Sequence, residues 1–206
     1  MRKLKYILAS VVLATGFASC ETEAIDEKVK DEAIPGKAIL RFDLNNQQTL
    51  VTNEVTVDWE GGSYFRIQAK LSIPNLEDTN PENNIEKYLS GYLSISYNTF
   101  ALGHFPSKLS LEELSNNTST ATLDIQYIEY DNERPIRTWV KYSTSYAAEN
   151  QESGFSNITH INISDNEKAR YVDGNFEYIV YPDIDNTIGK IQPLRLSTGS
   201  YYYVNY

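Results

Sequence analysis

Apolar and polar side chains alternate along most of the chain after residue 37, and this period of two constrains the fold more than any other feature. The stretch 64–73 shows it most clearly: Phe65, Ile67, Ala69, Leu71 and Ile73 alternate with Tyr64, Arg66, Gln68, Lys70 and Ser72. Successive side chains of a β-strand point to opposite faces, whereas an amphipathic helix repeats about every 3.6 residues. The stretch is therefore predicted to be a strand with one buried and one solvated face.

Eight further segments follow the same pattern: 40–44, 55–59, 89–97, 121–127, 136–142, 159–163, 172–180 and 200–206. Turn-forming residues separate them, such as Gly61 and Gly62 or the stretch 182–186. We therefore predict a single all-β domain over residues 37–206, an antiparallel sandwich or barrel-like domain of about nine strands. The capping box that starts at Ser110 and ends at Glu113 is the one helical signal.

The start of the chain has the three-part layout of a secretory signal. Arg2, Lys3 and Lys5 precede an apolar stretch at 6–17, and small residues follow it. We predict that residues 1–19 are a signal peptide. The apolar stretch is shorter than the about 20 residues that span a bilayer as a helix, so a permanent transmembrane anchor is not expected.

The segment Phe17-Ala18-Ser19-Cys20 resembles the lipobox of bacterial lipoproteins. This resemblance implies that Cys20 receives a diacylglycerol and a further acyl chain such as palmitate, and becomes the first residue of the mature protein. Two or more acyl chains give stable membrane anchoring. Cys20 is the single cysteine of the chain, so no internal disulfide is expected.

Residues 20–36 are rich in charge, poor in apolar side chains and end in Pro35-Gly36, which predicts a flexible tether. Directly behind the cysteine lie four acidic residues, Glu21, Glu23, Asp26 and Glu27. Such a cluster is similar to the signal that sends lipoproteins of some Gram-negative bacteria to the cell surface. The resemblance implies a lipid-anchored protein of the outer membrane, displayed on the surface.

A second resemblance lies in a strand, turn and strand near the C-terminus. After the segment 155–163, the residues Val172, Gly174, Phe176 and Tyr178 form a V-x-G-x-F-x-Y pattern. The pattern resembles the V-x-G-x-F-x-F strand of an uncharacterised family of β-rich surface lipoproteins. It implies a β-rich fold and no particular activity.

The charge of the chain excludes several partners. The signal holds three of the 18 basic residues and none of the 28 acidic ones, which leaves 15 against 28, a formal charge of −13 for the mature chain. Such a chain repels nucleic acid and anionic lipid, so neither is an expected partner.

The residues that support catalysis or cofactor binding are few. His104, expected in a loop, and His160 are the two histidines, and their spacing matches no zinc motif. The chain also has no Gly-x-Ser-x-Gly elbow and no phosphate-binding glycine loop. We therefore predict a non-catalytic protein without a cofactor.

The stretch Asp183-Ile-Asp185-Asn-Thr187 spaces oxygen ligands as in a calcium loop. It lacks the glycine and the final glutamate at the positions an EF-hand requires, and a plain β-turn is the favoured interpretation. We predict no metal site, with these three residues as the calcium alternative.

Sixteen tyrosines are unusual, and several fall on the polar side of their predicted strands. They are Tyr64, Tyr92, Tyr130, Tyr146, Tyr181 and members of the run 201–203. Such a face suits glycan stacking or protein contact, although tyrosine also simply favours strands and covers sheets well. For the last strand we expect that Tyr201, Tyr203 and Asn205 alternate with Tyr202, Val204 and Tyr206 and that its aromatic rings close the core.

These patterns favour a binding or accessory subunit of an outer-membrane protein assembly. One alternative is a glycan-binding module of a nutrient-uptake system, which predicts an exposed platform that includes Trp59 or Trp139. The other is a hydrolase, which predicts a pocket with two carboxylates or with a histidine near a carboxylate.

Overall fold

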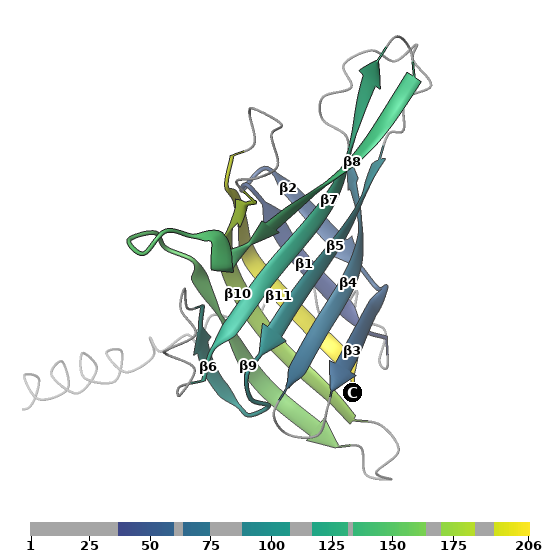
Figure 1. Ribbon diagram of the computed structural model, residues 1–206. Helices are drawn as coiled ribbons and strands as arrows, with labels where there is room; N and C mark the ends of the chain where they lie inside the picture. The colour runs from purple at the N-terminus through teal and green to yellow at the C-terminus, as the bar shows by residue number, and fades with distance from the viewer. Residues whose placement is uncertain are drawn as a thin grey trace, which may run out of the picture. The chain divides into compact units, whose positions relative to one another are not determined.

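Antiparallel strands make up most of the described chain in the computed structural model, which describes residues 37–59, 64–74, 88–107, 117–131, 134–163, 170–183 and 192–206 (Figure 1). The strands are β1 (Ile39–Leu44), β2 (Gln48–Thr52), β3 (Val55–Trp59), β4 (Phe65–Pro74), β5 (Tyr88–Tyr97), β6 (Gly103–Pro106), β7 (Ser119–Asp131), β8 (Arg134–Ser143), β9 (Gly154–Ile163), β10 (Arg170–Pro182) and β11 (Leu194–Asn205). The one helical turn in these ranges is the 3-10 turn η2 (Thr144–Tyr146). The predicted all-β antiparallel fold is confirmed.

The strands hydrogen bond in the order β2-β1-β11-β10-β8-β7-β5-β4-β3, and the sheet does not close. β9 pairs with β10, and β6 pairs with β9. β10 meets β8 only at its end, where Tyr181 and Pro182 pair with Ser143 and Tyr142. This short join divides the sheet into half A (β1, β2, β6, β9, β10 and β11) and half B (β3, β4, β5, β7 and β8), which enclose the core (Figure 1).

All nine predicted strands are present, and the structure adds β2 and β6. Both are short edge strands, since among the described strands β2 pairs only with β1 and β6 only with β9. Few of their side chains are buried, so their sequences alternate weakly between apolar and polar residues. The expectation that His104 lies in a loop was wrong, because it lies in β6 and pairs with Asn157 of β9. β6 ends in Pro106, which an edge strand tolerates because no ladder hydrogen bond is lost on its outer side.

Tyrosine hydroxyls inside the core connect the two halves. The hydroxyl of Tyr97 on β5 lies 2.6 Å from Ser156 Oγ on β9 and 3.0 Å from the hydroxyl of Tyr201 on β11. Tyr178 on β10 donates to Ser119 Oγ on β7 at 2.7 Å. The three tyrosines are fully buried, so each ring fills the core while its polar tip has a partner.

We expect the domain to lose stability steeply above pH 10 because of these three tyrosines. Burial raises the pKa of Tyr97 and Tyr178 well above the ordinary 10.0, and it raises the pKa of Tyr201 as well. Below pH 10 both folded and unfolded chains are protonated and stability is complete. Above it only the unfolded chain ionises, which costs up to about 1.4 kcal/mol per tyrosine and pH unit.

The measurement is denaturant unfolding between pH 8 and 12, with tyrosinate absorbance recorded in parallel. Tyrosinate that forms gradually in a still folded domain would contradict the prediction. The free energy of unfolding of the variant Tyr97→Phe should fall less steeply as the pH rises above 10.

The last strand lies inside the sheet, as predicted, between β1 and β10. The prediction that its side chains alternate strictly was wrong beyond Tyr201. Tyr201 and Val204 lie three residues apart, and both are fully buried. Between them lies a β-bulge in which Tyr203 has a φ of 52°, and its N–H donates to Asp173 Oδ1 at 2.8 Å. A bulge adds one residue to a strand and so shifts the buried phase.

A similar shift occurs in β9. The pattern 159–163 predicted Thr159 and Ile161 on the buried side, but Thr159 is exposed and Ile158 is buried. The register with β10 shifts between Ile158 and His160, so Ile161 packs against the core after the shift. His160 is exposed beside Thr159.

Candidate functional site

The outer face of half B carries a row of four side chains from four neighbouring strands. Lys70 of β4 pairs with Tyr92 of β5, Tyr92 with Asp124 of β7, and Asp124 with Lys141 of β8. The residues before and after each of them along the strand are buried in the core. Because strand side chains alternate, all four point outward, and we call them the outer-face row.

Trp139 of β8 projects from the same face, two residues before Lys141, and its ring meets that of Tyr92. The ring centroids are 5.7 Å apart and the planes are inclined by 33°. Tyr92 remains 48% exposed and Trp139 43% exposed, so much of each ring is open to solvent. The two rings form an aromatic pair on an otherwise polar face.

A groove of about 750 Å³ runs along this face beside the aromatic pair. Lys70, Tyr92 and Asp124 line it, together with Glu54, Gln68 and Ser94. Lys70 Nζ lies 3.2 Å from Glu54 Oε2, which extends the row to the edge of β3. The groove therefore offers cationic, anionic, amide and hydroxyl groups next to an aromatic surface.

Asp124 is a half-buried acid that lines the groove. Burial raises its pKa, and the positive charge of Lys141 opposes that rise. A carboxylate that is partly removed from water gains more from a hydrogen bond donated by a ligand than a fully hydrated one does. Asp124 is thus suited to accept hydrogen bonds from a polar ligand in the groove.

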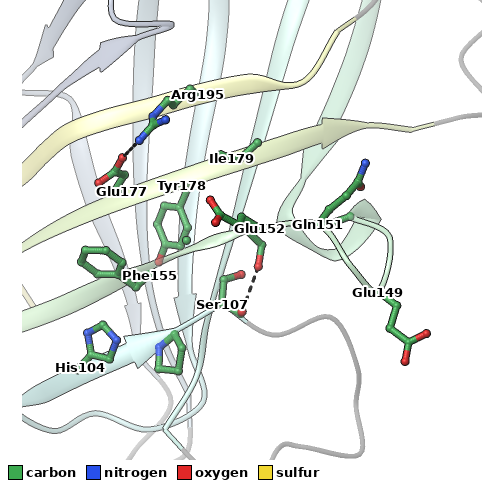
Figure 2. A pocket seen from close by; sticks show the side chains of 14 residues that line it. His104, Ser107, Glu149, Gln151, Glu152, Phe155, Glu177, Tyr178, Ile179 and Arg195 are labelled. Carbon is green, nitrogen blue, oxygen red and sulfur yellow. Dashed lines mark hydrogen bonds and ion pairs between the residues drawn. The ribbon is translucent and has the colours of Figure 1, made fainter.

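A second hollow of about 970 Å³ lies beside β6, β9, β10 and β11 (Figure 2). His104 and three carboxylates, those of Glu149, Glu152 and Glu177, line it, which is the combination that the hydrolase alternative predicts. Arg195 forms an ion pair with Glu177, and His104 Nδ1 lies 2.7 Å from Asn157 Oδ1. The ring of His104 is 5.0 Å from that of Phe155 (Figure 2). His104 is thus held by Asn157 and Phe155, and Glu177 by Arg195, whereas the outer-face groove lies beside an exposed aromatic pair and is taken as the candidate site.

The structure separates Trp59 and Trp139, either of which the glycan-binding alternative placed on an exposed platform. Trp139 points outward from half B, whereas Trp59 packs edge-on against Tyr206 at 5.4 Å and lies 5.8 Å from Phe100. Phe65 stacks on Phe100 at 4.5 Å in the same cluster. Trp59 thus belongs to an aromatic cluster at the margin of the core, and only Trp139 contributes to the exposed pair.

The tyrosines also divide into two groups. Tyr92 is exposed on the polar face, as the alternation indicated, whereas Tyr201 is fully buried with Tyr97, Tyr142 and Tyr178. Tyr64, Tyr146, Tyr181, Tyr202 and Tyr203 are half-buried, and the side chain of Tyr130 lies outside the described residues. One group of tyrosines therefore fills the core, and Tyr92 lies on a solvent-exposed polar face.

Several predicted site residues lie outside the described ranges. These are Cys20, Glu21, Glu23, Asp26 and Glu27 at the start, the capping box 110–113, and Asp185 and Thr187 of the calcium alternative. Asp183 follows β10, and its backbone N–H donates to Lys141 O at 2.9 Å. Within the described ranges, no three His, Cys, Asp or Glu side chains come together as a metal site.

In the part of the chain that the structure describes, no helix has the length and apolar character needed to cross a membrane. Comparison of the chain with protein-family models, with curated proteins and with solved structures finds no match.

Proposed function

We propose that this chain is a non-catalytic binding domain that serves as an accessory subunit of an outer-membrane protein assembly. It is anchored to the outer membrane of a Gram-negative bacterium through Cys20 and displayed on the cell surface. The exposed pair of Tyr92 and Trp139 carries the binding part of the proposal. Rings that point away from the core add nothing to its packing, and exposed aromatic side chains beside polar groups are common at recognition surfaces.

The spacing of the carboxylates supports a binding role over hydrolysis. Glu54 and Asp124 are the two carboxylates that line the groove, and Glu54 is engaged by Lys70. Glu54 directly precedes β3 and Asp124 lies on β7, so their backbones are three strand spacings, about 14 Å, apart. Glycosidases need two carboxyl groups about 5–9.5 Å apart, one on each side of the scissile bond. A backbone separation of this size, with Glu54 held by Lys70, does not favour such a pair.

The anchor rests on the sequence alone. A positive start, a short apolar stretch and small residues before Cys20 are the layout of a lipoprotein signal. The acidic cluster of Glu21, Glu23, Asp26 and Glu27 supports surface display.

We expect the substitution Cys20→Ala to move the chain from the membrane fraction to the soluble fraction of cells, because the acyl chains would be lost. Antibodies against the folded domain, applied after extraction in mild detergent, should co-precipitate an outer-membrane protein with the wild-type chain and much less of it with the variant. Cys20→Ser serves as a second variant without a lipid attachment site. Unchanged membrane partitioning of both variants would refute the anchor, and precipitation of the wild-type chain alone would refute the assembly.

A further inference from the structure

We propose that the outer-face groove binds a neutral carbohydrate chain. This rests on the proposed function in that the domain is a binding module, and it identifies the chemical class of its ligand. The site consists of the outer-face row, the aromatic ring of Trp139 and the polar side chains beside Lys70.

The aromatic pair matches one half of the chemistry of a sugar. A pyranose ring has an apolar face of C–H groups and a rim of hydroxyl groups, so it can lie on an aromatic ring and still keep its rim in polar contact. Tyr92 and Trp139 offer such a surface, with 48% and 43% of each residue exposed. Burial of this apolar area against a sugar face is favourable.

The polar side chains of the groove match the hydroxyl groups of a sugar. Lys70 can only donate hydrogen bonds and the carboxylate of Asp124 can only accept them, whereas the amide of Gln68 and the hydroxyl of Ser94 can do both. A sugar hydroxyl is both a donor and an acceptor. A ligand with many hydroxyl groups is therefore one that can satisfy this mixture.

The arrangement of the strands keeps these groups in neighbouring rows. Gln68 pairs with Ser94, and Ser94 pairs with Thr122, so amide and hydroxyl groups lie directly beside the outer-face row. Gln68 lies on β4 and Trp139 on β8, which are three strand spacings, about 14 Å, apart across the sheet. A ligand that contacts both Gln68 and Trp139 must therefore extend over several sugar units.

Charge favours a neutral polymer. Asp124 of the row and the neighbouring Glu54 each carry −1, and Lys70 and Lys141 of the row each carry +1, so the four formal charges cancel. The whole chain carries a formal charge of −10, which repels polyanions at longer range. An acidic polymer is therefore disfavoured, and the balanced charges of the groove give a neutral polymer no electrostatic penalty.

A protein partner fits this groove less well. The centre of a protein interface is depleted of charged residues and richer in apolar area than the surrounding surface. Here, Lys70, Asp124 and Ser94 line the groove beside Tyr92, and Lys141 lies two residues from Trp139 on β8. The composition is that of a wet, polar site with an aromatic platform.

The test is affinity electrophoresis of the full-length chain in native gels that contain amylopectin, xyloglucan or galactomannan, with polygalacturonate as the anionic comparison. The chain is purified from the cell fraction that holds it, in a zwitterionic detergent, because glycoside detergents would compete. We expect at least one neutral polymer to retard migration and polygalacturonate to have no effect. Calorimetry with oligosaccharides from that polymer then gives the affinity.

Trp139→Ala and Tyr92→Ala should each weaken binding by about tenfold or more, as is typical when a central aromatic anchor is truncated. Val51→Ala is the matched control, because Val51 is 56% exposed but lies on β2 in half A. It should bind like the wild-type chain. Thermal melting of each variant shows that its fold is intact, which is expected because all three side chains are largely exposed.

Absence of retardation by every neutral polymer would overturn this proposal, and so would retardation that neither Trp139→Ala nor Tyr92→Ala reduces. If no gel retards the chain but Trp139→Ala abolishes co-precipitation of an outer-membrane protein, the groove binds protein and the proposed function stands. If a neutral polymer binds in the expected way but nothing co-precipitates, the carbohydrate site stands and the accessory role fails.

Discussion

The substitution Gly174→Ala is expected to destabilise the domain by several kcal/mol, and so to leave little folded protein. A Cβ atom on Gly174 would lie 2.1 Å from the Tyr201 hydroxyl oxygen and 2.3 Å from the backbone oxygen of Asn157. The backbone oxygen belongs to β9, which pairs with β10 on either side of this point, so it cannot move without loss of the ladder. Domains of ordinary stability have only about 5–15 kcal/mol to lose.

Gly91→Ala is the matched control, because it makes the same change at a buried strand position in half B. Its Cβ would meet Ile73 Cδ1 at 2.8 Å, the end of a side chain that can rotate away, and backbone only at 3.4 Å. Denaturant unfolding of both variants in the Cys20→Ala background measures the difference. Similar losses in the two variants, or a loss below about 1 kcal/mol for Gly174→Ala, would show that the contact with β9 does not limit the fold.

Gly174 belongs to a reciprocal arrangement that explains the V-x-G-x-F-x-Y pattern. Gly174 pairs with Tyr201 and Phe176 pairs with Gly199 across β10 and β11, so each glycine faces an aromatic residue. A Cβ on Gly199 would lie 2.4 Å from the Phe176 ring. Small residues under large rings permit this close approach. The pattern therefore describes core packing, and the groove lies in the other half of the sheet.

Removal of residues 201–206 is expected to unfold the domain. The deletion takes away Tyr201 and Val204, both fully buried, and each lost core side chain of this size costs about 2–5 kcal/mol. It also removes the backbone partner of Ile39 and Leu40 in β1 and of Val172 in β10. The summed loss is comparable to the whole stability of an ordinary domain.

The measurement for this deletion is circular dichroism with thermal melting of the chain in the Cys20→Ala background. Tyr202→Ala is the matched variant, since Tyr202 is half-buried and lies between the two buried positions. It should retain a cooperative transition at a moderately lower temperature. A truncated chain that melts like the complete one would show that the end of β11 is not part of the core.

The sequence predicted the strands correctly where one side of the alternation is buried along the whole strand. β4 is the clearest case, since Phe65, Ile67 and Ala69 are all buried as expected. The prediction failed where the pairing itself breaks the period. At Tyr203 and near Ile158, bulges shift the alternation of buried and exposed side chains. A bulge depends on both paired strands, and the sequence of one strand does not show which strand pairs with it.

The candidate site shows the same limit. The sequence pointed to Tyr92 by its position on the polar side of a strand and to Trp139 as a platform residue, whereas Lys70, Asp124 and Lys141 belonged to no motif. Their common row follows from the register of three strand pairs. A shift of one residue in any pair would have moved a side chain to the opposite face.

The sequence alone determined the all-β class and nearly all of the strands, because the alternation of Phe65 to Ile73 and its counterparts is a local property of each segment. Tertiary structure alone decided which residues at the end of β11 fill the core. Tyr201 and Val204 are both fully buried although they lie three residues apart. The bulge between them depends on the pairing of β11 with β10, and a partner strand is not visible in the segment itself.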